Sequence, residues 1–375
     1  MKRSLPALLF ILILLHGVSA EASPCTKDSL SIKIGQMLMI GFRGLDARSA
    51  KGIDADIRNR GVGGVVLFDY DVPSSSPVRN IDSPEQVARL TSELQGMASI
   101  PLFIAIDQEG GRISRLKPSR GFPPSESAAH LGAVDNPDST KLAAGTTAGL
   151  LRSLQINMDL APVVDLNTNP DNPVIGRLER SFSRNPRVVT RHAGMFIDSF
   201  RASGIIPVLK HFPGHGSSTT DTHKGFTDVS ATWSKEELKP YRNLIRDGYD
   251  DPVMTAHVFN RRLDDLYPAT LSEAVVTGVL RRKLGFRGVV ISDDMQMKAI
   301  SGQYGLETAI RLAINAGVDI LIFGNNTGTY DPDIAEKATG IIRSLVTGGA
   351  VTPERIDESY RRVMSLKYRT IYPRK

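Results

Sequence analysis

Short apolar runs rich in β-branched residues recur along the chain and alternate with stretches that repeat at the helical spacing. Near-continuous apolar strands alternating with helices are typical of a parallel sheet covered on both faces. Eight such runs predict closure of the sheet into an α/β fold, a single (β/α)8 TIM barrel. The predicted strands span residues 35–42, 62–68, 101–107, 158–166, 205–212, 251–258, 288–294 and 318–324.

Helical patterns lie between these runs, and several begin at Ser or Asn and end at glycine, as capped helices do. A doubly wound open sheet is the alternative fold, but the glycine-rich turn that binds dinucleotides does not follow the first run. The barrel is therefore preferred. The predicted helices span residues 83–98, 139–154, 185–204, 234–248, 271–285 and 305–317.

The first twenty residues have the pattern of a secretory signal peptide, with Lys2 and Arg3 before an apolar run over 5–15. We expect residues 21–31 to form a tail and residues 32–375 to form the barrel, in an exported protein that is periplasmic or secreted. No second apolar run is long enough to cross a membrane. The single cysteine, Cys25, is expected to stay unpaired, and lipid attachment is the alternative.

Charge is only mildly biased along the chain. The formal net charge of +6 becomes +4 once the two cations of the signal peptide are removed. Basic residues do not interleave with aromatic residues in any run, so we expect no nucleic-acid partner.

Charged residues follow the predicted strands at their carboxyl ends, where the loops of a barrel converge and catalytic groups collect. A carboxylate at the tip of a buried strand is poorly solvated and close to the barrel axis, as a nucleophile would be. These strand-end residues are Asp107, Asp165, Lys210, His211, His257, Asp293 and Asp294. Of the last two, Asp293 is the candidate nucleophile, and Asp294 is expected to cap a helix starting near Met295 or to support its neighbour.

The segment KHFPGHGSSTTDTHKG, residues 210–225, is too polar for a core and too rich in glycine for a helix, so we expect a loop over the barrel mouth. Residues two apart can point the same way, so Asp221 can hold one nitrogen of His223 while the other faces the site. Such a histidine can donate and accept a proton near neutral pH. We expect residues 214–223 to act as a mobile lid.

In the segment 107–116, DQEGGRISRL, Asp107 can accept from hydroxyl groups, and Arg112 and Arg115 can donate to carbonyl, hydroxyl or anionic groups. For Glu109 and Arg112, a solvated salt bridge in a tight loop is the alternative.

A zinc site is the competing interpretation of the polar residues. The first and last strands, 35–42 and 318–324, supply no ligand, so no metal is expected. The zinc site would draw on His211, His215, Asp221, His223 and His257.

Five motifs in register resemble the bacterial β-N-acetylglucosaminidase branch of glycoside hydrolase family three, from about residue 32 to about residue 370. They are DQEGGRISRL, NPVIGRLERSF, KHFPGHG followed by Asp-x-His, VMTAHV and ISDDMQMKAI. The resemblance implies a barrel, a nucleophile at Asp293 and an acid/base His223 paired with Asp221. It implies sugar contacts from Asp107, Arg115, Arg180, Lys210, His211 and His257, and Arg177 competes with Arg180 because the NPVIGRLERSF motif carries extra residues.

The activity implied is hydrolysis of a terminal β-linked N-acetylglucosamine with net retention, by a monomer that needs no cofactor. The substrate would be a carbohydrate, a glycan containing N-acetylglucosamine. Alternatives are a β-glucosidase or β-xylosidase, a phosphorylase that uses phosphate as acceptor, a metallohydrolase, and a secreted sugar-binding protein without catalysis.

Overall fold

The computed structural model describes residues 28–50 and 52–372. The predicted signal peptide and Cys25 therefore lie outside the described residues. Within the described ranges, none of the helices combines the length and the apolar character needed to cross a membrane.

The first helix, α1 (Ser29–Gln36), begins earlier than expected. Asp28 accepts a hydrogen bond from the backbone N–H of Ser31 at 2.7 Å and so caps the helix. The buried Ile34 anchors it to the core. Residues 29–31 of the predicted tail belong to this helix, which its cap and its buried residues stabilise.

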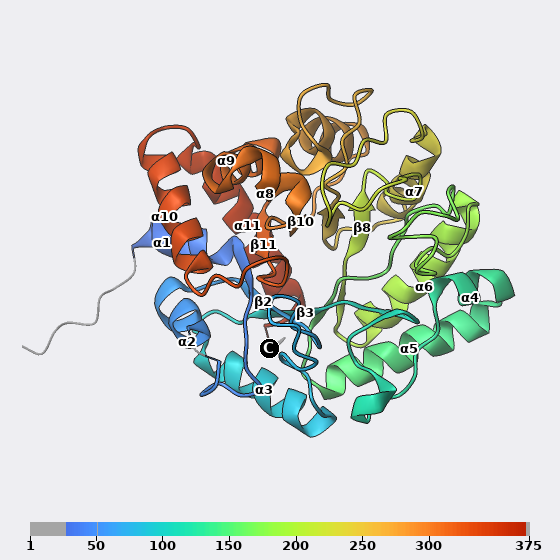
Figure 1. The fold of residues 1–375 in the computed structure, drawn as a ribbon, viewed down its shortest axis with the longest axis horizontal. Helices are drawn as coiled ribbons and strands as arrows, with labels where there is room; N and C mark the ends of the chain where they lie inside the picture. The colour runs from blue at the N-terminus through green and yellow to red at the C-terminus, as the bar shows by residue number, and fades with distance from the viewer. Residues whose placement is uncertain (1–27, 51, 373–375) are drawn as a thin grey trace, which may run out of the picture.

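Nine strand segments of the described chain form one parallel sheet that closes on itself, which confirms the predicted barrel (Figure 1). The two ends of the sheet, β7 and β8, are halves of the predicted fifth strand, separated only by Val208. Each of the eight predicted runs contains a strand. The strands are β1 (Leu38–Gly41), β2 (Gly64–Leu67), β3 (Phe103–Ile106), β6 (Met158–Asp159), β7 (Ile206–Pro207), β8 (Leu209–Phe212), β9 (Val253–Thr255), β10 (Val290–Asp294) and β11 (Ile320–Phe323).

Helices surround the barrel, and all six predicted segments contain helical turns. Ser83, Asn136 and Asn185 cap three of them with side-chain hydrogen bonds, and a proline follows each cap. The α-helices that follow α1 are α2 (Ile53–Ala55), α3 (Pro84–Met97), α4 (Ala128–Val134), α5 (Pro137–Ser153), α6 (Pro186–Ala202), α7 (Lys239–Arg246), α8 (Lys298–Tyr304), α9 (Leu306–Ala316), α10 (Ile334–Thr347) and α11 (Pro353–Thr370).

Shorter elements complete the chain. A hairpin of β4 (Gln108–Gly110) and β5 (Ile113–Ser114) follows β3 directly. The predicted helix over 271–285 forms as a π-helix, η5 (Ala274–Lys283). The remaining helical turns are η1 (Asp56–Arg60), η2 (Pro118–Arg120), η3 (Lys235–Leu238) and η4 (Ala269–Leu271).

Apolar side chains form two layers, because successive strand residues point to opposite faces of the sheet. On β1, Met39 points into the barrel, whereas Leu38 and Ile40 pack outward beneath the helices. Phe103 and Met158 join Met39 in the interior layer. The strands are thus held from both sides, which makes them a rigid frame for residues at their ends.

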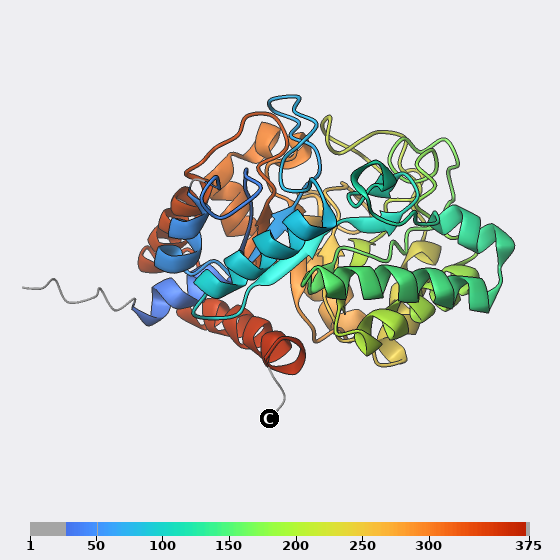
Figure 2. The same cartoon turned by 90° about the horizontal axis from the view of Figure 1, so that it is seen from below.

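Helix α11 closes the amino end of the barrel and lies beneath the strands near the C-terminus in Figure 2. Its residues Val363 and Leu366 belong to the interior apolar layer. The amine of Lys367 donates to the Gln36 side chain at 2.7 Å and to the Gly63 carbonyl at 2.8 Å. Burial lowers the pKa of Lys367 well below its ordinary value. The carboxyl ends of the strands are therefore the open end of the barrel.

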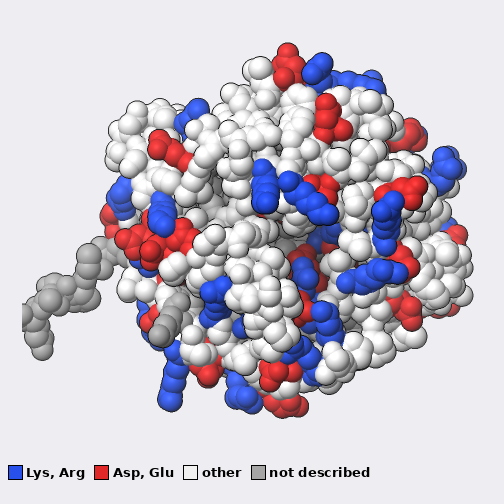
Figure 3. Space-filling view, in the orientation of Figure 1, with Lys and Arg blue, Asp and Glu red and all other residues white. Residues whose placement is uncertain are grey.

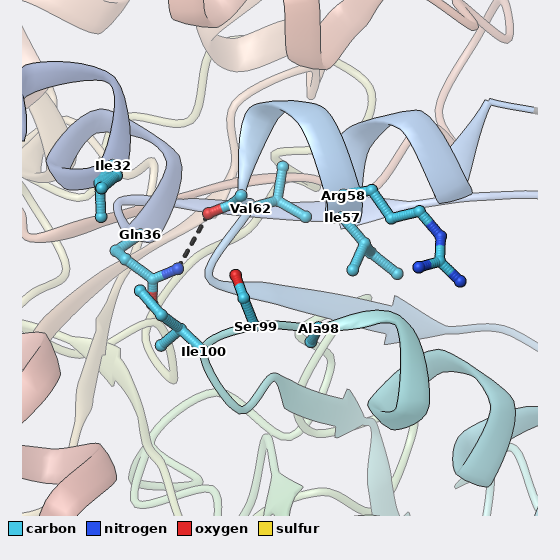
Figure 4. Close-up of a pocket in the computed structure, with 9 residues that line it drawn as sticks. Ile32, Gln36, Ile57, Arg58, Val62, Ala98, Ser99 and Ile100 are labelled. Atoms are coloured by element: carbon cyan, nitrogen blue, oxygen red, sulfur yellow. Dashed lines mark hydrogen bonds between the residues drawn. The ribbon is translucent and has the colours of Figure 1, made fainter. Parts of the chain in front are cut away.

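A cavity of about 410 Å³ also lies at the amino end, between α1, η1 and the segment before β3 (Figure 4). Ile32, Ile57 and Ile100 line it, and Gln36 donates across it to the Gly61 carbonyl at 2.9 Å. Its described lining includes no acid and no histidine. This cavity is therefore separate from the predicted catalytic residues.

Candidate active site

A buried charge network lies at the carboxyl ends of β3 and β8. The amine of Lys210 is 2.7 Å from an oxygen of Asp107 and 2.6 Å from an oxygen of Glu109. Arg180 binds both oxygens of Glu109 at 2.7 Å, and Arg115 reaches Asp107 at 3.3 Å. Segments far apart in sequence thus meet around one cluster, and Figure 3 shows a hollow on one face with both charges beside it.

Ion pairing keeps the carboxylates of this network ionised. Burial raises the pKa of Asp107, but Lys210 and Arg115 lower it by more, and the net pKa is well below the ordinary value. Burial likewise raises the pKa of Glu109, but Arg180 and Lys210 lower it by more, so the pKa of Glu109 is below its ordinary value. A rigid cluster of ionised groups can donate to and accept from several hydroxyl groups at once.

The alternative for Glu109 and Arg112, a surface salt bridge between them, is wrong. Glu109 is 8% exposed and pairs with cations inside the barrel mouth, because β4 turns its side chain inward. Arg112 is exposed and lies 4.0 Å from Glu179. Glu109 is thus a site residue that hydropathy alone assigned to the surface.

The two candidate arginines are separated by the structure. Arg180 has an 11% exposed side chain within the network, and it also lies 3.2 Å from Nε2 of His211. Arg177 has a 64% exposed side chain that lies 3.6 Å from Asp171. Only Arg180 is positioned to take part in the site.

Two further acids were given no role by the sequence pattern. Asp165, after β6, accepts from His211 Nδ1 at 2.7 Å and so orients that imidazole. Asp69, after β2, binds Lys117 at 2.5 Å and lies 3.7 Å from Arg115. Asp165 lies near the end of the predicted strand 158–166 and Asp69 directly follows the predicted strand 62–68, so position at a strand end was the signal that could have found Asp69 as well.

Two adjacent acids at the end of β10 have different environments. Burial raises the pKa of Asp293, but three imidazoles around it lower the pKa by more, to below its ordinary value. These imidazoles belong to His257, His211 and His223. Burial raises the pKa of Asp294 to about 6. Asp293 is therefore the acid that is ionised throughout the neutral range.

Of the two roles expected for Asp294, capping a helix and supporting its neighbour, the structure favours the second. Helix α8 begins only at Lys298, and Asp294 instead accepts the backbone N–H groups of Gln296 at 3.0 Å and Gly324 at 3.1 Å. These bonds fasten the end of β10 to the loop after β11. Asp294 thus supports the position of Asp293.

His257 is buried and bonded on both ring nitrogens. Nδ1 lies 2.9 Å from the Thr270 hydroxyl and Nε2 lies 2.9 Å from the Asp294 carbonyl. Burial lowers the pKa of His257. A sugar contact from this residue would have to replace one of these bonds, and it stays a prediction.

The Asp221–His223 contact expected from spacing is present. One oxygen of Asp221 lies 2.9 Å from His223 Nδ1 and accepts the His223 backbone N–H at 2.9 Å. Partial burial lowers the pKa of His223, but Asp221 and the charge of Asp293 raise it by more. The imidazole is 55% exposed, so Nε2 is available to a ligand.

The expectation that residues 210–225 are too polar to be buried is wrong for the first nine. The segment 210–218 is buried because other elements supply its hydrogen-bond partners. Asn172 donates to the carbonyls of His215 at 2.7 Å and Gly216 at 3.1 Å, and the N–H of Gly216 donates to Glu237 at 3.1 Å. Gly216 must be glycine, since a Cβ there would lie 1.7 Å from a backbone oxygen.

The histidines and acids of the site do not converge as metal ligands. Within residues 28–50 and 52–372, no group of three or more His, Cys, Asp or Glu side chains is arranged to hold a metal ion.

Comparison with known families decides the assignment. Residues 29–366 match the model described as the N-terminal domain of glycosyl hydrolase family 3. The chain belongs to glycosyl hydrolase family 3. The closed barrel described above is the fold of this family 3 domain.

Family 3 relatives cover most of the chain. β-Hexosaminidase A of Pseudoalteromonas piscicida is 33% identical over an alignment of 343 residues, which covers 82% of this chain and 55% of that protein. β-Hexosaminidase LpqI of Mycobacterium tuberculosis is 33% identical over 359 residues, 94% of this chain and 84% of that protein. A solved family 3 β-N-acetylglucosaminidase from Paenibacillus is 36% identical, with a TM-score of 0.82 over 91% of this chain and 62% of that chain. The chain thus spans about half to two thirds of two of these longer relatives.

Proposed function

We propose that this protein is a retaining, exo-acting β-N-acetylglucosaminidase that acts on cell-wall-derived or other glycans. The observation that carries the proposal is the half-buried carboxylate of Asp293 at the carboxyl end of β10, in a barrel mouth that also holds the Asp221–His223 pair. The imidazoles of His257, His211 and His223 lower the pKa of Asp293, and the charge of Asp293 raises the pKa of His223. The names of the family 3 relatives support N-acetylglucosamine as the sugar.

In the first step, a carboxylate oxygen of Asp293 attacks the anomeric carbon and the glycosidic C–O bond breaks. His223 donates the proton on Nε2 to the leaving oxygen, so the aglycone departs as a neutral alcohol. Asp221 accepts from Nδ1 and stabilises the imidazolium before transfer. The product of this step is a glycosyl ester of Asp293.

In the second step, Nε2 of His223 accepts a proton from water while the water oxygen attacks the anomeric carbon. The ester bond to Asp293 breaks and the carboxylate is restored. Two inversions at the same carbon leave the sugar with its original configuration.

The buried network is suited to holding the sugar. Asp107 and Lys210 are fixed by their ion pairs and can bind hydroxyl groups without reorganising. We assign the same role to Arg180, His211 and Arg115, which contact or surround this pair.

A panel of nitrophenyl glycosides tests the proposal. We expect the N-acetylglucosaminide to be cleaved and the glucoside and xyloside to react far more slowly, with the β-anomer of the sugar released first. Equal rates on the glucoside would favour a β-glucosidase, and sugar 1-phosphate formed in phosphate buffer would favour a phosphorylase. Loss of activity with a chelator would favour a metallohydrolase, and no turnover of any glycoside would favour a binding protein.

Replacement of Asp221 by asparagine tests the acid/base assignment through pH. The carboxylate raises the pKa of His223, so it keeps the imidazole protonated to higher pH. In Asp221→Asn, the alkaline limb of the kcat/KM profile should therefore move to lower pH. Asp228→Asn is the control, because Asp228 makes a similar local bond to Ser230 away from the imidazole. An unmoved alkaline limb in the first variant would contradict the assignment.

A further inference from the structure

Thr222 is buried between two more exposed neighbours. It is 1% exposed, whereas the side chains of Asp221 and His223 are 17% and 55% exposed. Its hydroxyl lies 3.3 Å from Nε2 of His215, and its carbonyl accepts the backbone N–H of Ala299, at the start of α8, at 3.3 Å. A hydroxyl enclosed in this way, beside the catalytic pair, links that pair to the barrel.

His215, the partner of Thr222, is held in place by buried hydrogen bonds. Its backbone N–H donates to Asp165 at 2.8 Å, and its carbonyl accepts from Asn172 at 2.7 Å. Both partners are buried, at 1% and 0% exposure. The backbone of His215 is therefore held by the segment that follows β6.

In the bond between Thr222 and His215, the Thr222 hydroxyl is the donor. The hydroxyl of Ser218 donates to the carbonyl of His215 at 3.1 Å, so it has no second hydrogen and must accept from Nδ1 of His215 at 2.8 Å. Burial and the neighbouring His211 lower the pKa of His215 to about 4, so the ring is neutral. Nε2 is then an acceptor, and the hydroxyl of Thr222 donates to it.

The surrounding segment, residues 220–226, has one bond within itself and two contacts with the chain outside it. Lys224 N–H donates to the Asp221 carbonyl at 3.0 Å, and the hydroxyl of Thr220 lies 3.0 Å from that of Thr227. The ring of Phe226, which is 47% exposed, lies 5.2 Å from the ring of Phe259. The Thr222 side chain differs from these in binding His215, whose backbone N–H donates to Asp165.

We propose that Thr222 is a positioning residue for His223. The hydrogen bond from the Thr222 hydroxyl to His215 sets the height and the angle of the Asp221–His223 pair relative to the sugar. The inference rests on the proposed function, in which His223 protonates the leaving oxygen. Without the bond, the imidazole still carries its proton but stands out of line with the glycosidic oxygen.

Leaving-group dependence separates this role from a merely structural one. Cleavage of a 2,4-dinitrophenyl N-acetylglucosaminide needs little help from an acid, because the phenolate is a stable anion. Cleavage of a phenyl or disaccharide substrate needs the proton. A misplaced acid therefore lowers the rate on the phenyl and disaccharide substrates and leaves the rate on the 2,4-dinitrophenyl substrate nearly unchanged.

The experiment measures kcat/KM of Thr222→Val and Thr222→Ala on the 2,4-dinitrophenyl and phenyl substrates. We expect a loss of about 10- to 100-fold on the phenyl substrate, the scale of a displacement of about 1 Å, and little loss on the other. Thr222→Ser keeps the donor and should restore most of the activity. The ratio of the two rates is independent of the folded fraction, so partial misfolding of a variant cannot imitate the result.

Thr232→Val is the control, since Thr232 is exposed and lies outside the loop of residues 210–225, and both of its rates should stay unchanged. Equal losses on both substrates in Thr222→Val, or no loss on either, would overturn the role of Thr222. His223→Ala distinguishes the two levels of proposal. If His223→Ala loses activity mainly on the phenyl substrate and Thr222→Val does not, the positioning role fails and the proposed function stands. If His223→Ala shows no such selectivity, both fail.

Discussion

Asp293→Ala is expected to lower kcat/KM on a nitrophenyl N-acetylglucosaminide by on the order of 10⁴-fold or more, the scale on which enzymes lose rate when a covalent nucleophile is removed. The carboxylate is half-buried at the end of β10, and the imidazoles of His257, His211 and His223 lower its pKa. Alanine leaves a space next to the anomeric carbon that no other described carboxylate is fixed to fill. Steady-state kinetics on purified protein measures the loss.

Azide distinguishes loss of the nucleophile from loss of structure. In Asp293→Ala it can occupy the vacated space, attack the anomeric carbon once and release an α-glycosyl azide, with faster turnover. In His223→Ala the nucleophile remains, so any azide adduct should have the β-configuration. A β-adduct from Asp293→Ala, or covalent labelling of another residue by a fluorinated sugar inactivator, would contradict the assignment.

Glu109→Gln is expected to lower the free energy of unfolding by about 3–5 kcal/mol, the usual cost of breaking a buried ion pair. Glu109 is the shared partner of Arg180 and Lys210, and its replacement leaves two cations with the charge of Asp107 alone. Activity should fall as well, because Lys210 and Arg180 lose their fixed positions. Urea unfolding and the kinetics of the same preparation measure both effects.

A surface pair is the control for this result. Glu179 lies 4.0 Å from Arg112 and both are exposed, so Glu179→Gln should lower the free energy of unfolding by less than about 1 kcal/mol.

The pH dependence of stability gives a second test of the Glu109 ion pairs. Folding lowers the pKa of Glu109. The contribution of Glu109 to the free energy of unfolding is therefore fully present above the ordinary pKa of a glutamate, and it is lost as pH falls through the pKa of Glu109 in the folded protein. Glu109→Gln should therefore lose less stability on acidification than the parent protein, and an identical acid limb would contradict the ion-pair account.

Much of the site could be predicted from local sequence. Asp107, Lys210, His211 and Asp293 stand at strand ends, and the barrel brings strand ends together. The contact between Asp221 and His223 depends on a spacing of two residues and needs no tertiary information. Glu109 and the buried role of the segment 210–218 were not predicted, because their polar character is typical of a surface loop.

The sequence by itself determined the strands, most of the helices and the strand-end residues of this family 3 barrel. A strand buried on both faces needs a continuous apolar run, and a helix needs caps and periodic apolar positions. Both kinds of element can therefore be predicted from residues that are close together in the sequence. The tertiary structure alone decided which polar residues are buried. Burying a polar group costs free energy unless it is paired, and Arg180, which binds Glu109, lies 71 residues away from it in the chain. No local pattern can report a partner that only the closed barrel brings within reach.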